Sequence, residues 1–250
     1  MNNVQSSEVV IVQSKLFSQF PNLVFGMSTR LGGVSPDPLG MNLSYSVGDD
    51  SKNVEVNRSR FFRTLGITED RFALPKQIHS NVVKEAATPG IYPDCDALMT
   101  NTRNIVLGVS VADCVPIFLY DPVTSSIAAV HSGWRGSKQK ILGVAIEALI
   151  QKYDVKPSNL VGYIGPSAGV CCYEVGEEVA AAFDDEFVKR EPDKKPHLDL
   201  KCFNKHLMLQ SGLKEANIEI SDDCTICNDL YHSFRRDGNR SGRMYGVVGR

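Results

Sequence analysis

Residues 105–131, IVLGVSVADCVPIFLYDPVTSSIAAVH, decide the fold, because apolar and β-branched side chains are densest there. Three nearly continuous apolar runs lie within this segment, at 105–111, 115–120 and 127–130. Runs of this length and composition are typical of strands that are buried on both faces. An Asp-Pro pair after the second run predicts a turn. The segment therefore predicts a buried, β-rich centre of the molecule.

Outside this centre, short strands and helices alternate only loosely. The predicted strands are 9–12, 23–28, 160–164 and 243–249, and the predicted helices are one capped by Asp49 or Asp50 that ends at Gly66, then 138–153, 174–183 and 199–213. Residues 29–50 form a loop rich in Gly, Pro and Asn, and loops of this length are usually functional or disordered. The charged stretch 184–196 predicts a solvated loop. The pattern predicts a mixed α/β sandwich and not a regular doubly wound sheet. Because nothing resembles a linker, we expect a single domain over residues 1–250.

The composition restricts the class of protein. The chain has 250 residues, of which 42% are hydrophobic, and a net charge of −2. This charge gives no electrostatic reason to expect nucleic acid or an anionic membrane as a partner, and no apolar run is long enough to span a bilayer. Residues 1–8 lack the basic and apolar regions of a signal peptide. Seven cysteines, an odd count, favour free thiols over a disulfide framework, so we expect a cytoplasmic protein.

Two histidines and one cysteine, His79, Cys114 and His131, stand at the ends of short apolar segments. Imidazole and thiolate are ligands that zinc prefers, and three protein ligands leave a coordination position open, as in catalytic sites. Taken singly, each residue is also explained as an ordinary core or surface residue. His131 has the most support, because it enters the sequence HSGWRG, whose glycines predict backbone packed closely against something. Arg135 in that sequence is a candidate for holding an anion.

Two further loops place an arginine beside glycine, where backbone amides can cradle a phosphate. These are Arg30 in TRLGG and Arg243 in RSGR. A turn with a solvated arginine explains either instance equally well. Asp113, next to Cys114, is a candidate proton acceptor or a group that holds a zinc ligand in place, and it is also explained as a helix or turn cap.

The remaining cysteine motifs are ambiguous. Cys171 and Cys172 follow a glycine-rich turn, where a nucleophile is conceivable, but no histidine lies nearby in sequence. Cys224 and Cys227 have the C-x-x-C spacing of a metal knuckle or redox pair. Because there is no second C-x-x-C and only His232 follows at short range, we expect this pair to serve structural packing and not to bind zinc.

Taken together, the motifs resemble one family, the laccase-domain proteins long described as multicopper polyphenol oxidases. The family is now described as zinc-dependent purine nucleoside phosphorylases with adenosine deaminase activity, and some bacterial members are called peptidoglycan editing factors. The resemblance covers about residues 25–248. It rests on Thr29-Arg30-x-Gly-Gly33, Gln77-Ile78-His79, Ala112-Asp113-Cys114-Val-Pro116, His131-Ser-Gly-Trp-Arg-Gly136, Gly165-Pro-Ser-x-Gly169 with Cys172-Tyr-Glu-Val-Gly176, and Arg235-Arg-Asp-Gly238 with Ser241-Gly-Arg-Met244.

The resemblance implies a single-domain α/β/β/α sandwich and a zinc ion held by His79, Cys114 and His131, with a purine nucleoside beside the metal. Two reactions would follow. Water would attack C6 of adenosine and release ammonia, or phosphate would attack C1′ of the nucleoside and release the purine. Phosphorolysis needs cationic groups around phosphate, and we expect Arg30 and Arg243 to supply them. Gln77 and Asn42 are candidate polar contacts to the nucleoside, and Asp113 is a candidate proton shuttle.

Three alternatives stay open beside this hypothesis. A multicopper oxidase needs more imidazoles than the five histidines of this chain supply, so copper is a weaker expectation than zinc. A cysteine amidohydrolase that edits peptidoglycan precursors would use Cys114 as its nucleophile and a histidine as base. A non-catalytic zinc-stabilised binding protein is disfavoured, since a structural site is normally closed by a fourth ligand.

Overall fold

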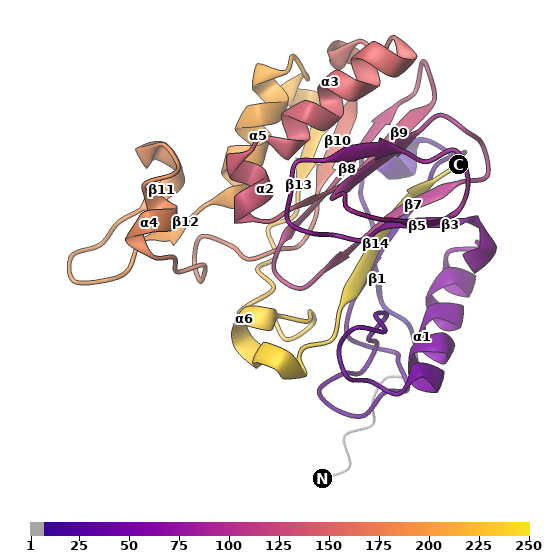
Figure 1. The fold of residues 1–250 in the computed structure, drawn as a ribbon, viewed down its shortest axis with the longest axis horizontal. Helices are drawn as coiled ribbons and strands as arrows, with labels where there is room; N and C mark the ends of the chain where they lie inside the picture. The colour runs from indigo at the N-terminus through magenta and orange to yellow at the C-terminus, as the bar shows by residue number, and fades with distance from the viewer. Residues whose placement is uncertain (1–7) are drawn as a thin grey trace.

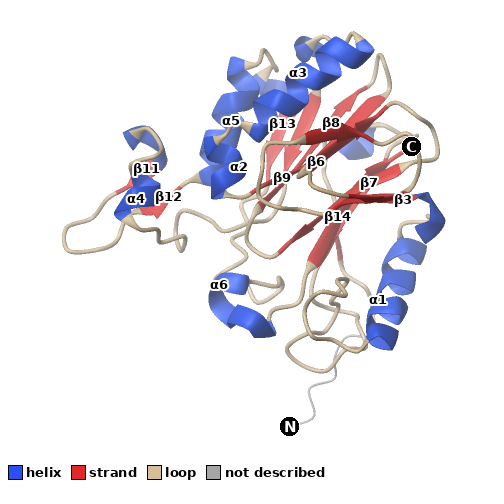
Figure 2. Ribbon diagram, viewed as in Figure 1, coloured by secondary structure: helices blue, strands red, loops and turns tan. Residues whose placement is uncertain are grey.

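The computed structural model describes residues 8–250, so residues 1–7 of the predicted domain, where we expected no signal peptide, lie outside it. Two six-stranded mixed sheets make up the body of the described chain (Figures 1 and 2). The first sheet has the order β1 (Ile11–Val12), β2 (Val24–Ser28), β14 (Met244–Gly249), β7 (Val106–Val111), β3 (Phe72–Pro75) and β5 (Gly90–Tyr92). The second has the order β13 (Ile218–Ile220), β10 (Val161–Ile164), β8 (Val115–Asp121), β9 (Ser126–Ser132), β6 (Ala97–Thr100) and β4 (Val83–Glu85).

The described chain has six α-helices, which are α1 (Ser51–Thr64), α2 (Trp134–Lys138), α3 (Ile141–Tyr153), α4 (Glu177–Ala180), α5 (Leu200–Gln210) and α6 (Phe234–Asp237). The three longest, α1, α3 and α5, cover the outer faces of the two sheets (Figure 2). Helix α1 packs on the first sheet through Phe61 and Phe62, and α3 and α5 pack on the second sheet through residues such as Leu149 and Leu207. A small hairpin of β11 (Val188–Lys189) and β12 (His197–Leu198) projects from the body together with α4 (Figure 1).

Aromatic and aliphatic side chains fill the space between the two sheets. Phe25 from the first sheet contacts Phe118 and Tyr163 from the second, with ring centroids 5.1 Å apart in each pair and edge-to-face geometry. These three rings are almost completely buried, and such pairs add about 0.5–1.5 kcal/mol each beyond the burial of their area. The layers are therefore α1, first sheet, second sheet, and α3 with α5. This arrangement confirms the predicted α/β class and its mixed-sheet α/β/β/α sandwich.

Local sequence signals account for some element boundaries and fail for others. Asp50 caps α1 by accepting a hydrogen bond from the backbone N of Lys52, and Gly66 follows that helix with a φ of 67°. The predicted helix 174–183 is wrong for most of its length, because only α4 is helical. Glu174 instead pairs with His197 in an isolated β-bridge, so tertiary pairing overrides the helical pattern there.

The strand ends place several loops at one edge of the sandwich. The end of β7 lies beside the start of β14, where Val111 pairs with Met244, and the start of β8 lies beside the end of β9, where Val115 pairs with Ser132. The loop after β3 reaches the same edge, since β3 is the parallel neighbour of β7. Among residues 8–250, no helix is long and apolar enough to cross a membrane.

Candidate metal centre

His79, Cys114 and His131 converge at this edge. His79 lies in the loop after β3, Cys114 in the turn between β7 and β8, and His131 in β9 beside Pro116 of β8. Their ligand atoms all lie within 4.8 Å of one another. The two imidazole rings meet edge to face, with centroids 5.0 Å apart. The structure thus brings together the three residues that the sequence offered as zinc ligands.

Asp96, which the sequence analysis did not single out, orders both imidazoles. Its buried carboxylate accepts hydrogen bonds from the backbone N of Ile78, His79 and Ser80, at 3.2, 2.9 and 2.7 Å. The same carboxylate lies 2.9 Å from Nδ1 of His131. Burial alone would raise the pKa of Asp96, but hydrogen bonds from His131 and Ser80 lower the pKa to about 2. An ionised Asp96 accepts from Nδ1–H of His131, which leaves Nε2 of that ring with its lone pair for a metal.

The same electrostatics favour the thiolate of Cys114. Burial alone would raise the pKa of this thiol, but the neighbouring His131 and His79 lower it below its ordinary value. In turn, burial opposes the charge on His131, whereas Cys114 and Asp96 raise the pKa of its ring. A thiolate between two imidazoles is the donor set that zinc selects.

Two glycines allow the HSGWRG segment to pack against the ligands, as its composition predicted. A Cβ on Gly133 would lie 3.0 Å from Sγ of Cys114 and 3.2 Å from Cδ2 of His79. A Cβ on Gly136 would lie 3.0 Å from the carbonyl oxygen of Ser80. The absence of a side chain at Gly133 therefore keeps α2 in contact with the metal-ligand atoms.

The three ligands open onto a cavity of about 600 Å³. Its walls come from the loop before α1, from β3 and the loop after it, from the β7–β8 turn, from α6 and from the start of β14. The lining residues are Ser44, Ser46, Leu74, Pro75, Lys76, Gln77, His79, Ser110, Val111, Ala112, Cys114, His131, Phe234, Arg243 and Tyr245. A volume of this order suits a ligand of nucleoside size.

Gln77 and Arg243 are the predicted substrate contacts that line this cavity. The Gln77 amide accepts from the backbone N of Ser110 and donates to its carbonyl oxygen, both at 2.8 Å, so it joins the ends of β3 and β7. The Arg243 guanidinium donates from Nη1 to the carbonyl oxygens of Ser241 and Gly242, at 2.8 and 3.0 Å. Within residues 8–250 these are the hydrogen bonds of the guanidinium, so its other N–H groups can donate to a ligand, and burial lowers its pKa from the ordinary value.

The other three predicted contacts, Arg30, Asn42 and Arg135, are not among the residues that line it. The buried Asn42 side chain holds the loop together, and its Oδ1 accepts from the backbone N of Arg243 at 2.9 Å. Arg30 lies 3.9 Å from the carboxylate of Asp37. Arg135 stacks over the ring of Trp134, with its guanidinium carbon 4.4 Å from the ring centroid.

Three hydrogen bonds engage the carboxylate of Asp113, the candidate proton shuttle. Oδ1 accepts from the hydroxyl of Thr225 at 2.6 Å, and Oδ2 accepts from the hydroxyl of Ser233 and the backbone N of Arg235 at 3.0 and 2.6 Å. Asp113 has a φ of 90° and is not one of the residues lining the cavity. This geometry favours a role in holding the turn that carries Cys114, and the proton-shuttle role stays a prediction.

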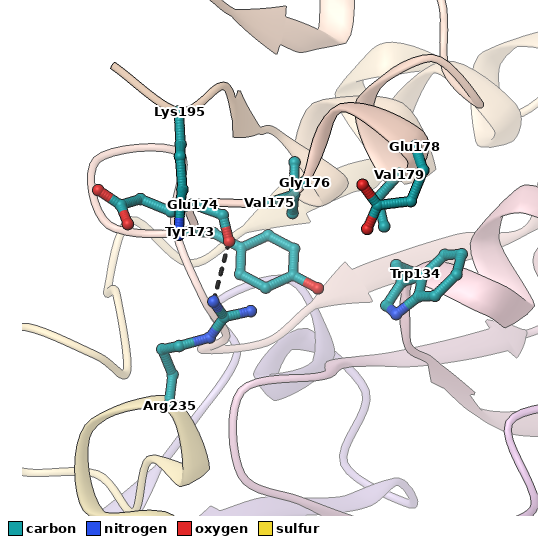
Figure 3. Close-up of a pocket in the computed structure, with 9 residues that line it drawn as sticks. All are labelled: Trp134, Tyr173, Glu174, Val175, Gly176, Glu178, Val179, Lys195 and Arg235. Atoms are coloured by element: carbon teal, nitrogen blue, oxygen red, sulfur yellow. Dashed lines mark hydrogen bonds between the residues drawn. The ribbon is translucent and has the colours of Figure 1, made fainter. Parts of the chain in front are cut away.

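A second, smaller hollow of about 290 Å³ lies beside α2 and α4 (Figure 3). Arg235 lies over the ring of Tyr173, 5.2 Å from its centroid, and donates to the carbonyl oxygen of Glu174 at 3.0 Å. Figure 3 shows Trp134 and Glu178 on the opposite side of the Tyr173 ring. This hollow carries charges of both signs, whereas the larger cavity is the one that contains the three metal-ligand candidates, and we take the larger one as the candidate site.

Several site residues had no local sequence signal. Phe234 and Tyr245 bring aromatic rings to the cavity, and Lys76 adds a cation. His232 is buried, and both of its ring nitrogens have no hydrogen-bond partner. Burial, together with the charges of Arg30 and Arg243, lowers the pKa of His232 to about 3. The sequence carries no sign of such neighbours, because these residues come from separate segments that only the fold brings together.

The chain is similar to proteins of known family and fold. The family described as multi-copper polyphenol oxidoreductase laccase matches residues 24–250. A purine nucleoside phosphorylase of Deinococcus radiodurans is 37% identical over 238 residues, covering 92% of this chain and 90% of that protein. An adenosine deaminase called RL5, from an unknown prokaryotic organism, is 34% identical and covers 82% of this chain and 85% of its own. The crystal structure of YlmD from Geobacillus stearothermophilus superposes with a TM-score of 0.89 at 28% identity, covering 97% of this chain and 99% of that one. These relatives confirm the expectation of an enzyme.

Proposed function

This chain belongs to the family described as multi-copper polyphenol oxidoreductase laccase, and from that premise we propose that it is a zinc-dependent purine nucleoside phosphorylase that also deaminates adenosine. Purine nucleosides and phosphate are its proposed substrates. The observation that carries the proposal is the convergence of His79, Cys114 and His131 at the wall of a cavity of about 600 Å³. The names of relatives that cover most of the chain support the substrate class.

The donor set supports zinc over copper. Two imidazoles and one thiolate are a complete set of protein ligands for a catalytic zinc, and the cavity provides the space for a fourth, exchangeable ligand. Five histidines in the whole chain are too few for the several copper ions of a multicopper oxidase. When bound, zinc supplies a Lewis acid at the cavity wall.

The chain's own residues divide the remaining work. Arg243 holds a phosphate through the N–H groups that its backbone contacts leave available, with Arg30 and the unsatisfied His232 behind it. Phe234, half exposed and 5.5 Å from the Arg243 guanidinium, offers a flat surface for a purine. Gln77 holds the β3 end in register with β7, so that His79 faces Cys114.

A second candidate function rests on one observation. The two imidazoles that lower the pKa of Cys114 would also activate it as the nucleophile of an amidohydrolase. The two proposals exclude each other, because a thiolate that ligates zinc is not free to attack a carbonyl. The seven free cysteines support a reducing, cytoplasmic location under either proposal.

The deciding experiment measures base release from inosine by protein of known metal content, with and without phosphate and with and without a chelator. The proposal expects hypoxanthine only in the presence of phosphate and its loss with the metal. A parallel assay with adenosine measures ammonia, which should appear without phosphate. Protein that carries stoichiometric zinc at His79, Cys114 and His131 but releases neither product would contradict the proposal. Metal-free protein that cleaves an amide substrate would favour Cys114 as nucleophile.

A further inference from the structure

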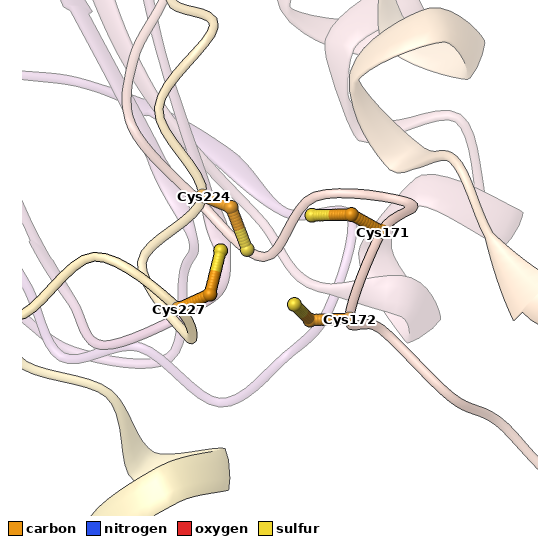
Figure 4. A group of neighbouring side chains, drawn as sticks. All are labelled: Cys171, Cys172, Cys224 and Cys227. Atoms are coloured by element: carbon orange, nitrogen blue, oxygen red, sulfur yellow. The ribbon is translucent and has the colours of Figure 1, made fainter.

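A second group of metal-ligating side chains lies outside the cavity. Cys171, Cys172, Cys224 and Cys227 bring four sulfur atoms within 4.8 Å of one another. In Figure 4 the four side chains turn toward a common centre, two from each of two loops. The C-x-x-C pair, which has no second C-x-x-C in the sequence, thus meets an adjacent cysteine pair instead.

The fold itself brings the two loops together. Strands β10 and β13 are parallel neighbours, so the loops that leave their ends begin side by side. Ser167 in the first loop forms a β-bridge with Cys224 in the second, and the backbone N of Thr225 donates to the carbonyl oxygen of Ser167 at 3.0 Å. The cysteine pairs are therefore held in register by backbone pairing and not by the sulfurs alone.

Backbone amides surround the sulfur of Cys224. The backbone N of Gly169 donates to Sγ of Cys224 at 3.2 Å. Amides directed at the first sulfur of a C-x-x-C turn favour a thiolate there. A Cβ on Gly169 would lie 3.1 Å from Cβ of Cys224 and 3.3 Å from Sγ of Cys171, so the loop approaches the sulfurs closely.

Packing does not explain the cluster. Cys224 is buried, but Cys171 and Cys227 are exposed and Cys172 is half-buried. Four thiols so placed gain little from the hydrophobic effect, and their thiolates repel one another unless a cation lies between them.

We propose that Cys171, Cys172, Cys224 and Cys227 bind one zinc ion as a closed structural site. Four sulfur ligands in tetrahedral geometry select zinc or iron, and zinc–sulfur bonds of about 2.3 Å place the sulfurs about 3.8 Å apart. The observed spacing needs only a small contraction. A zinc ion with four thiolates has a net negative charge, and Lys201 lies against the second loop, where Nζ donates to the carbonyl oxygens of Ser221 and Asp223 at 2.7 Å each.

The proposed site would fasten the loops that support the candidate metal centre. Thr225 follows Cys224 directly and donates to Asp113, and Asp113 precedes Cys114. The backbone N of Ala168 donates to the carbonyl oxygen of Asp113 at 2.9 Å, from the loop of the other cysteine pair. A zinc ion at the cysteine cluster would thus hold both loops against the turn that carries Cys114.

Metal counting tests this proposal independently of any nucleoside assay. Full-length protein purified under reducing conditions should contain two zinc ions per chain by inductively coupled plasma mass spectrometry. The variant His79→Ala/His131→Ala should retain one zinc ion, and Cys224→Ser/Cys227→Ser should also retain one. Cys202→Ser, which changes an exposed cysteine outside both clusters, is the matched control and should retain two.

Failure of the proposed function and failure of this site give different results. If the protein does not act on nucleosides, the proposed function fails, but the His79→Ala/His131→Ala variant should still contain one zinc ion at the cysteine cluster. That variant also decides the question if the cysteine variant does not fold. A folded His79→Ala/His131→Ala protein without zinc, iron at the cysteine cluster, or cysteine pairs found as disulfides by intact mass under native preparation would each overturn the proposal. Cobalt loaded into the same variant should give the strong near-ultraviolet absorption of several thiolate ligands, and its absence would also overturn it.

Discussion

The molecule gathers metal-ligating side chains at two places that differ in almost every physical respect. The histidine–cysteine centre has three donors, an ionised carboxylate behind them and a cavity in front. The cysteine cluster has four donors, backbone amides behind them and partial exposure to solvent. A missing fourth ligand beside a cavity leaves room for a substrate, whereas four sulfurs leave none. The histidine–cysteine centre is therefore suited to catalysis, and the cysteine cluster to holding loops together.

The largest effect should come from the carboxylate behind the open centre. Asp96→Asn keeps the size of the side chain but replaces an acceptor by an N–H group that faces the N–H donors of residues 78–80 and His131. Mutation of a group that holds a metal ligand in place lowers metal affinity or activity by about 10–100-fold. We therefore expect turnover to fall by about 100-fold, measured by steady-state kinetics. Asp94→Asn, on the exposed neighbour, is the matched control and should retain full turnover. Equal turnover in both variants would contradict the role of Asp96.

Arg243→Ala tests the phosphate contact in the cavity. A hydrogen bond to a charged group contributes about 1.5–3 kcal/mol, so the KM for phosphate should rise by about 10- to 100-fold while the deamination of adenosine changes little. Arg240→Ala removes an exposed arginine three residues earlier and serves as the control. Full phosphate dependence in Arg243→Ala would remove this residue from the anion site.

The close approach of α2 to the ligands gives an intermediate effect. Gly133→Ala adds a Cβ at 3.0 Å from Sγ of Cys114, and overpacking of this kind costs about 1–3 kcal/mol. We expect about a tenfold loss of zinc affinity, measured by chelator competition. Gly143→Ala, in α3, meets only Cβ of Lys140 at 3.9 Å and should leave zinc affinity unchanged. Unchanged affinity in Gly133→Ala would show that the ligands can shift without cost.

Asp113→Asn separates proton transfer from positioning. The Asp113 carboxylate accepts from Thr225, Ser233 and Arg235, and a hydrogen bond contributes about 0.5–1.5 kcal/mol. We expect turnover to fall about threefold with no change in the shape of its pH profile, and Thr225→Val should behave alike. A fall of about 100-fold or more, with one limb of the pH profile lost, would instead support the proton shuttle.

The smallest effect on catalysis should come from the cysteine cluster. Cys227→Ser removes an exposed ligand that does not line the cavity, so turnover should stay within about twofold of the original. The melting temperature, measured calorimetrically in zinc-containing buffer, should nevertheless fall by about 5 °C. Cys202→Ser should change neither quantity. An unchanged melting temperature in Cys227→Ser would show that the cysteine cluster does not stabilise the folded protein.

The sequence predicts the centre of the fold better than its edges. The apolar runs at 105–131 became β7, β8 and β9, because strands buried on both faces need apolar side chains throughout. Short strands such as β4 and β13 carry alternating or charged residues and form only because a neighbour pairs with them. Their existence depends on contacts between distant segments, which local periodicity does not contain.

The candidate site divides in the same way. The three metal-ligand candidates could be found from residue type and flanking motif, and Arg243 from its glycine-bearing loop. Asp96 could not, because its importance lies in hydrogen bonds to residues 78–80 and to His131, and these exist only after β6 pairs with β9. The cysteine cluster escapes sequence-based prediction for the same reason, since it depends on the parallel pairing of β10 with β13.

The place of β14 in the first sheet has a consequence for how the protein is made. This strand lies between β2 and β7 and is hydrogen-bonded on both sides, although it follows every other described strand in the sequence. Until residues 244–249 leave the ribosome, β2 and β7 each present an unpaired edge, which is a template for aggregation. A nascent chain that stalls before residue 243 lacks Arg243, and one that stalls just after it lacks the strand that holds Arg243 in place. Synthesis of β14 is therefore the step that both fills the gap between β2 and β7 and completes the cavity wall.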